Sequence, residues 1–158
     1  MKSERSVPKG DTVKRIMAVG VFDLLHAGHL HYLEQAKALG DHLTVVVAHD
    51  DTVRKRKHDP ITNQDLRKRM VEGLKPVDKV IVGNPPEVPI FDILPVIKPN
   101  TIALGYDQEH AEENIRSALK SRGFDSIEVV RVEGLTDDLD GTRKIIARIL
   151  QRAARKEE

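Results

Sequence analysis

The sequence predicts an α/β protein: a single Rossmann-like domain with a five-stranded parallel sheet and helices on both of its faces. Five short apolar runs alternate with amphipathic segments along the chain, which is typical of repeated βαβ units. Aromatic residues make up only 3% of the chain, so Val, Ile, Leu and Ala must build the core, as in buried parallel strands. A length of 158 residues suits one compact domain.

The elements follow from these patterns in chain order. Residues 1–14 are polar and aperiodic and are interpreted as a flexible N-terminal arm, so the domain is expected over 15–158. The predicted strands are Ile16–Phe22, Leu43–Ala48, Val80–Val82, Ile102–Leu104 and Ile127–Val132. The predicted helical segments span Leu30–Leu39, Asn63–Leu74, the region of Phe91–Leu94, about Gln108–Ser121, and Ile145–Leu150. The charged segment 49–59 is expected to be a flexible basic loop.

Charge and composition exclude several classes of protein. The chain has 26 Lys and Arg and 25 Asp and Glu, which gives a net charge of +1. A charge this small produces no electrostatic field over the whole molecule that would attract a nucleic acid. The chain has no cysteine, which excludes disulfides, thiolate catalysis and cysteine-based metal sites. No apolar run approaches the roughly 20 residues that cross a bilayer, so we expect a cytoplasmic protein without a membrane or nucleic-acid partner.

Two histidines follow the first predicted strand within the segment GVFDLLHAGH. His26 and His29 flank Gly28 where the strand turns into the first helix, so both imidazoles and the first helix amides are expected to converge. A helix N-terminus with unpaired N–H groups suits an anion, and glycine permits close approach of a phosphate to the backbone. The alternative interpretation is that His26 caps the helix and His29 lies on the surface.

This segment resembles the HxGH nucleotidyltransferase (cytidylyltransferase-like) superfamily, in particular archaeal-type FAD synthetases and the related glycerol-3-phosphate cytidylyltransferases. The resemblance spans about residues 15–150. Further matches follow in the order of the family: LGD at 39–41, the basic cluster RKRKH at 54–58, an arginine at position 67, and VDKVIVG at 77–83.

The resemblance implies roles for individual residues. His26, His29 and Lys57 are the expected catalytic residues, with Lys55 as the alternative to Lys57. Arg67 is expected to hold phosphate. Asp23 is expected to orient a histidine or to face the acceptor substrate, although it could instead cap the turn. The basic cluster also remains open to interpretation as a solvated charge run or a nucleic-acid patch.

The resemblance also indicates which nucleotide is bound. LGYDQ at 104–108 is similar to the archaeal-type FAD synthetases, in which the aspartate contacts ATP. RVEG at 131–134 resembles the start of the RTEGISTT signature that holds CTP, but here LTDDLD and then GTRKI follow. The residues expected to bind ATP are Val21, Phe22, His26, Ala27, Gly28, His29, Asp107, Gly141 and Thr142.

The expected reaction is adenylyl transfer from ATP to FMN, which gives FAD and pyrophosphate. Mg²⁺ or another divalent cation is expected to bridge the triphosphate, without a site built from protein ligands alone. Members of the family are commonly dimers, so a homodimer is expected. The alternatives are cytidylyl transfer to glycerol 3-phosphate or another small phosphate ester, and a nucleotide-binding module that has lost turnover.

Overall fold

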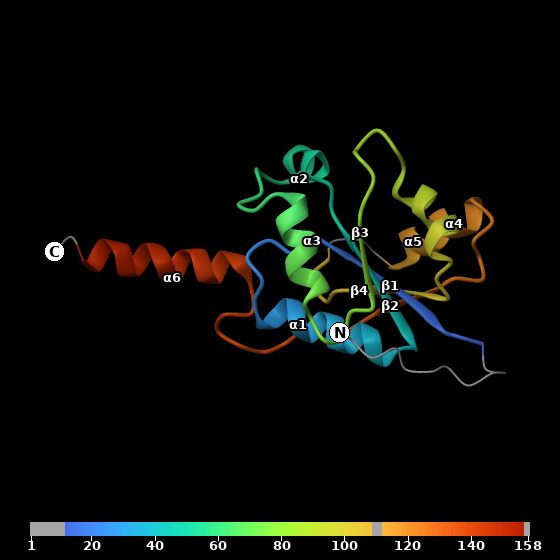
Figure 1. Cartoon of the computed structure of the whole chain (residues 1–158), viewed down its shortest axis with the longest axis horizontal. Coiled ribbons are helices and arrows are strands. Elements are labelled where there is room, and N and C mark those ends of the chain that lie inside the picture. Colours follow the sequence, from blue (N-terminus) through green and yellow to red (C-terminus); the bar gives the residue numbers. More distant parts are fainter. Residues whose placement is uncertain (1–11, 109–111, 157–158) are drawn as a thin grey trace.

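The computed structural model describes residues 12–108 and 112–156. Five parallel strands form one sheet in the order β3-β2-β1-β4-β5 (Figure 1). The strands are β1 Arg15–Gly20, β2 His42–Val47, β3 Lys79–Val82, β4 Thr101–Leu104 and β5 Glu128–Arg131. The helices are α1 Ala27–Ala38, α2 Asp50–Arg56, α3 Gln64–Glu72, the 3-10 helix η1 Ile90–Ile93, α4 Leu94–Ile97, α5 Glu112–Ser121 and α6 Thr142–Arg155.

Helices cover both faces of the sheet, because successive strand side chains point to opposite sides. Ile16 and Ala18 of β1 pack with Leu33 of α1 and Val71 of α3 in one core. Met17, between them, packs on the other face with a second core that includes residues of α4 and α5. The predicted fold class is therefore confirmed.

The sheet opens between β1 and β4, where the strand order reverses. Backbone pairing of these strands ends at Ala18 and Ala103. Beyond that point the Tyr32 hydroxyl accepts from the Val19 N–H (3.3 Å) and donates to the Ala103 carbonyl (2.7 Å). The Gln108 side-chain amide donates to the Val19 carbonyl (2.7 Å). Hydrogen bonds from side chains thus replace the backbone pairing of β1 and β4 at the carboxyl ends of the strands. Sheets of this kind bind their ligands at these ends.

The segment after β2 differs from the prediction. Residues 50–56 form helix α2 rather than a flexible loop, so that part of the prediction is wrong. His49 caps this helix by accepting from the Asp51 N–H, and the first turn is acidic and the last turn basic, as the helix dipole favours. The N-terminal arm stays a prediction, because residues 1–11 lie outside the described part of the chain.

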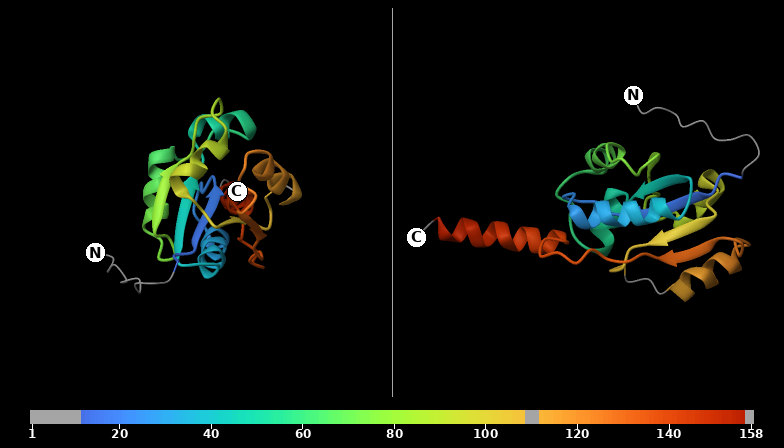
Figure 2. Two further views of the ribbon diagram at one scale, coloured as in Figure 1. Left: turned by 90° about the vertical axis from the view of Figure 1, so that its right-hand side faces the viewer. Right: turned by 90° about the horizontal axis from the view of Figure 1, so that it is seen from below.

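Helix α6 extends away from the body of the domain (Figures 1 and 2). None of its residues is buried, and Ile149 and Leu150 are 58% and 64% exposed. Its N-terminus, by contrast, lies against the turn that precedes α1, because Thr142 contacts Asp23 there. Among the described residues, no helix combines the length and the apolar character that crossing a membrane requires.

Candidate active site

The turn between β1 and α1 has an unusual backbone. Phe22 and Leu24 both adopt positive φ angles, 56° and 49°, which cost energy for residues with side chains and concentrate at functional sites. The Phe22 ring folds back over Gly20, where a Cβ atom would lie 2.8 Å from it. Glycine at position 20 therefore makes the fold of this turn possible.

A ladder of rings leads from the core to the histidine pair. Tyr32 stacks on Phe22 (6.3 Å between centroids), and Phe22 contacts His29 (5.4 Å). His29 stacks on His26 at 3.8 Å. Each imidazole also accepts a backbone N–H at Nδ1: His26 from Gly28 (3.1 Å) and His29 from His26 (3.4 Å). These bonds form a capping box at the start of α1 and leave Nε2 as the protonated nitrogen of each neutral ring.

Both imidazoles are held in the neutral form. Burial, together with the neighbouring His26 ring, lowers the pKa of His29 to about 4, and Asp23 opposes this shift only in part. Burial also lowers the pKa of His26, against the opposing carboxylates of Asp140 and Asp107. At neutral pH the pair therefore offers two Nε2–H donors to an anion while adding no full positive charge of its own.

The start of α6 closes the site from the other side. The space that a Cβ atom would take at Gly28 is filled by the Asp140 carbonyl oxygen, 2.3 Å away. The Thr142 hydroxyl donates to the backbone carbonyl of Asp23 (3.2 Å). At Gly141 nothing lies within 4 Å of the position that a Cβ atom would take, and no side chain caps α6. Gly28 is thus required for the packing of the two segments, in addition to any approach of phosphate.

Asp23 is buried, and its carboxylate binds the loop that follows α2. Its carboxylate accepts from the Ile61 N–H (2.6 Å), the Thr62 N–H (3.0 Å) and the Thr62 hydroxyl (2.6 Å). Although burial raises the pKa of Asp23, these hydrogen bonds and the nearby Arg67 hold it below its usual value. A contact between Asp23 and the acceptor stays a prediction, and in this arrangement its oxygens already have partners.

Arg67 is 1% exposed and ties together the carboxyl ends of two strands. Its guanidinium donates to the carbonyls of Val21 (2.6 Å), Ala48 (3.0 Å) and Thr62 (2.9 Å), and to the Asp50 carboxylate (2.6 Å). The predicted phosphate contact of Arg67 stays a prediction that this arrangement does not support. The residue instead fixes the backbone of the β1–α1 turn, which sequence reasoning did not anticipate.

The two candidate lysines lie at the end of α2. Lys55 is in its last turn and Lys57 is its C-terminal cap residue, and both are exposed. Arg54, in contrast, is bound by Asp51 and Asp59 (2.9 and 2.7 Å). Neither lysine ammonium forms an ion pair with a carboxylate in the described part of the chain, so both remain available to an added anion.

The predicted ATP-binding residues gather at one edge of the sheet. Val21 and Phe22 precede the histidines, Ala27 begins α1, and Asp107 follows β4 and acts electrostatically on His26. Asp140, which sequence reasoning did not single out, acts on His26 as well. Only its place just before a helix could have pointed to it.

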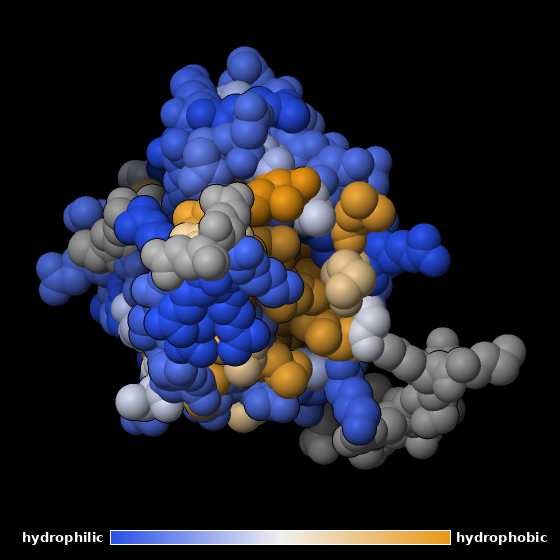
Figure 3. Space-filling model, turned by 90° about the vertical axis from the view of Figure 1, so that its left-hand side faces the viewer, coloured by the Kyte–Doolittle hydropathy of each residue, from blue (hydrophilic) through white to orange (hydrophobic). Residues whose placement is uncertain are grey.

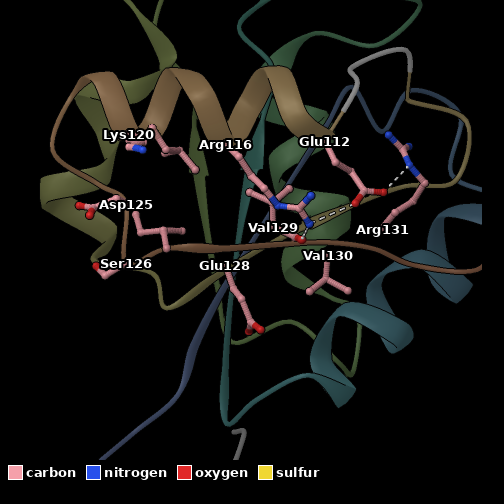
Figure 4. Close-up of a pocket in the computed structure, with 11 residues that line it drawn as sticks. Glu112, Arg116, Lys120, Asp125, Ser126, Glu128, Val129, Val130 and Arg131 are labelled. Carbon is pink, nitrogen blue, oxygen red and sulfur yellow. Dashed lines mark hydrogen bonds and ion pairs between the residues drawn. The ribbon is translucent and has the colours of Figure 1, made fainter.

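A cavity of about 640 Å³ lies elsewhere. It is a groove between α5 and the edge strand β5 (Figure 4). Arg116 crosses it and donates to the Val129 carbonyl (2.8 Å), and Glu112 pairs with both Arg116 and Arg131. Neither histidine of the pair lines this groove, which is therefore separate from the site at the β1–α1 turn.

Comparison with known proteins shows the family of the chain. A family model described as cytidylyltransferase-like matches residues 17–148. The FAD synthase of Aciduliprofundum boonei is 47% identical over 139 residues, 87% of this chain and 91% of that protein. The FAD synthase of Pyrococcus horikoshii is 44% identical over 87% of this chain and 93% of that protein.

A solved structure shows the same fold. The crystal structure of the lipopolysaccharide core biosynthesis protein from Thermoplasma volcanium has a TM-score of 0.75 and 39% identity, and covers 79% of this chain and 100% of that one. The family model covers most of the chain and includes both histidines. The chain therefore belongs to the cytidylyltransferase-like family of nucleotidyltransferases.

Proposed function

We propose that this chain is an FAD synthase, which transfers the adenylyl group of ATP to FMN and releases pyrophosphate. The observation that carries the proposal is the histidine capping box, which aims two neutral imidazoles and the start of α1 at the edge where β1 and β4 part. FAD synthases that are 41–47% identical over most of the chain support the choice of nucleotide and acceptor.

The chemistry requires no covalent enzyme intermediate. An oxygen of the FMN phosphate attacks the α-phosphorus of ATP, the bond to the bridging oxygen breaks, and pyrophosphate leaves with that electron pair. The Nε2–H groups of His26 and His29 donate hydrogen bonds to the phosphate oxygens as charge develops on them. Because the ring ladder and the capping box fix both imidazoles beforehand, little reorganisation accompanies the reaction.

Both imidazoles are neutral, so the positive charge that neutralises the triphosphate must come from other groups. We propose that Lys57, or its neighbour Lys55, reaches the triphosphate from the end of α2. No group of three or more His, Cys, Asp or Glu able to hold a metal occurs among the described residues. A divalent cation such as Mg²⁺ would therefore take its oxygen ligands mainly from the triphosphate, and it would neutralise charge there.

The direct test supplies the protein with Mg²⁺ and either ATP or CTP, together with either FMN or glycerol 3-phosphate. Pyrophosphate release and product chromatography are followed for all four pairs. We expect product with ATP and FMN only. Activity with CTP and glycerol 3-phosphate would instead identify a cytidylyltransferase. ATP binding without pyrophosphate from any pair would identify a nucleotide-binding module, which the altered GTRKI start of α6 would explain.

We also propose that two copies of the chain associate through α6. Figure 3 shows an apolar area on the face from which α6 projects, and α6 exposes Ile149 and Leu150. Antiparallel pairing of two α6 helices would cover these two exposed apolar side chains.

The association is tested by measuring molecular mass in solution. We expect a dimer for the wild type and a monomer for Ile149→Glu, while a monomeric wild type would refute this pairing. A cytoplasmic location, expected from the sequence, stays a prediction.

A further inference from the structure

Tyr106 follows β4 at the point where β1 and β4 part, and it is 50% exposed. Its neighbour Asp107 is one of the residues expected to bind ATP. The carboxylates of Asp107 and Asp140 act electrostatically both on the His26 ring and on the Tyr106 hydroxyl. Tyr106 therefore belongs to the same edge of the site as the histidine pair, although the reaction described above gives it no part.

One face of the Tyr106 ring is supported from behind. A Cβ atom at Gly134 would lie 2.5 Å from two carbons of the ring, so the ring rests directly on the glycine backbone. The hydroxyl lies near Asp140 and Asp107, and burial together with these two carboxylates raises the pKa of Tyr106. A flat aromatic surface is thus fixed in place, with much of its area open to solvent.

The chain offers no comparable surface for a ring-shaped substrate. All five aromatic residues of the sequence lie in the described part. Phe22 is buried, and the Tyr32 hydroxyl is bound between β1 and β4. Phe91 lies under the Arg122 guanidinium at 4.4 Å, and Phe124 packs against the core on the α5 side.

The charges around Tyr106 indicate which ring would stack there. Asp107 and Asp140, the latter also paired with Lys144 (2.6 Å), are hydrogen-bond acceptors and suit a base that bears an amino group. Adenine carries such a group, whereas the isoalloxazine of FMN presents mainly carbonyl oxygens at its polar edge. The exposed cations of Lys55 and Lys57 follow β2 on the other side of β1 and so suit phosphate groups.

We propose that the open face of Tyr106 is the platform on which the adenine of ATP stacks, with Gly134 as its support. This inference rests on the proposed use of ATP and assigns its base to the β4 side of the site. Stacking of a base on an aromatic side chain changes affinity by roughly 5-fold to 150-fold in Kd. Tyr106 is therefore a positioning residue for the nucleotide and takes no part in the bond changes.

The test measures binding of Mg²⁺-ATP and of Mg²⁺-tripolyphosphate, which has no base, by calorimetry in the absence of FMN. Three variants are compared with the wild type: Tyr106→Leu removes the ring, Tyr106→Phe keeps the ring but loses the hydroxyl, and Gly134→Ala displaces the ring. We expect Tyr106→Leu and Gly134→Ala to weaken ATP binding roughly 5-fold to 150-fold. Tyr106→Phe should bind ATP nearly as the wild type does, and tripolyphosphate should bind all four proteins alike.

Equal losses for ATP and tripolyphosphate would show a merely structural role and would overturn the inference, as would unchanged ATP binding in Tyr106→Leu. A parallel titration follows quenching of FMN fluorescence. If Tyr106→Leu abolished that quenching and left ATP binding intact, the ring would belong to the acceptor and the inference would fail. Because turnover is never measured, loss of ATP binding in Tyr106→Leu would support the platform even if the chain did not make FAD.

Discussion

The site is built from two regions that are held in different ways: the β1–α1 turn (residues 21–29) and the closing segment (residues 133–141). The turn is fixed from within the protein, by the ring ladder, by the buried Arg67 and by the capping box. The closing segment is held in part by ion pairs with α6, where Asp138 pairs with Arg148 and Asp140 with Lys144.

The difference separates two tasks of one site. Groups that stabilise developing charge must keep their positions throughout the reaction, and buried hydrogen bonds provide this. The closing segment depends in part on the exposed pair of Asp138 and Arg148, and such pairs contribute little to stability. Substitutions in the two regions should therefore differ in their effects.

Removal of one imidazole should have the largest effect, because the turn is assigned the chemistry. His29→Ala is expected to lower kcat by roughly 100-fold to 1000-fold, the usual effect of losing one preorganised donor. The rate of pyrophosphate release measures it. The matched control is His31→Ala, on the same helix, which should retain wild-type turnover. A His29→Ala enzyme that kept most of its kcat would remove the turn from the mechanism.

The low pKa of His29 predicts how stability depends on pH. Its folded pKa of about 4 lies below the unfolded value of 6.5, so the unfolded chain takes up the proton first as the pH falls. The contribution is complete above pH 6.5 and is lost progressively down to pH 4, by about 3 kcal/mol. Denaturant unfolding at several pH values measures it. In His29→Gln this part of the decline should be absent, and an identical decline in both proteins would contradict the assignment.

Replacing glycine by alanine should affect stability differently at the starts of α1 and α6. Gly28→Ala places a Cβ atom 2.3 Å from the Asp140 carbonyl and should destabilise the protein by about 1–3 kcal/mol. Gly141→Ala meets nothing within 4 Å and adopts an ordinary extended φ of −144°, so its melting temperature should not change. If the start of α6 receives the nucleotide, Gly141→Ala should nevertheless weaken ATP binding. Equal melting temperatures for both variants would show that the two regions are not packed together as described.

The smallest effect is expected at the surface of the closing segment. Asp138→Asn removes the ion pair with Arg148, and the two side chains are 70% and 41% exposed. Exposed pairs are screened by solvent, so melting temperature and kcat should both stay at wild-type values. Thermal unfolding and a steady-state assay are sufficient to check this. A clear loss of stability would mean that the closing segment is held more firmly than its contacts indicate.

Much of the fold could be predicted because local patterns determine it. A short, β-branched apolar run such as Leu43–Ala48 is typical of a strand buried on both faces, and β2 spans His42–Val47. The segment after β2 is predicted as a basic loop but forms the short helix α2. His49 and two acidic residues stabilise the start of this helix, and the many charges of the segment give no apolar pattern from which a helix could be predicted. The histidine pair was found from its spacing, although its role as a capping box was foreseen only in part.

The five strands, the family and the histidines at the first turn can be predicted from the amino-acid sequence, because they depend on residues close together in the chain. The tertiary structure alone decided what Asp23 and Arg67 do, since most of their partners lie 17–46 residues away. It also decided that Gly28 meets Asp140 and that Tyr106 rests on Gly134. Such contacts arise only when parallel strands bring their carboxyl ends to one edge, and no local pattern shows which side chains meet there.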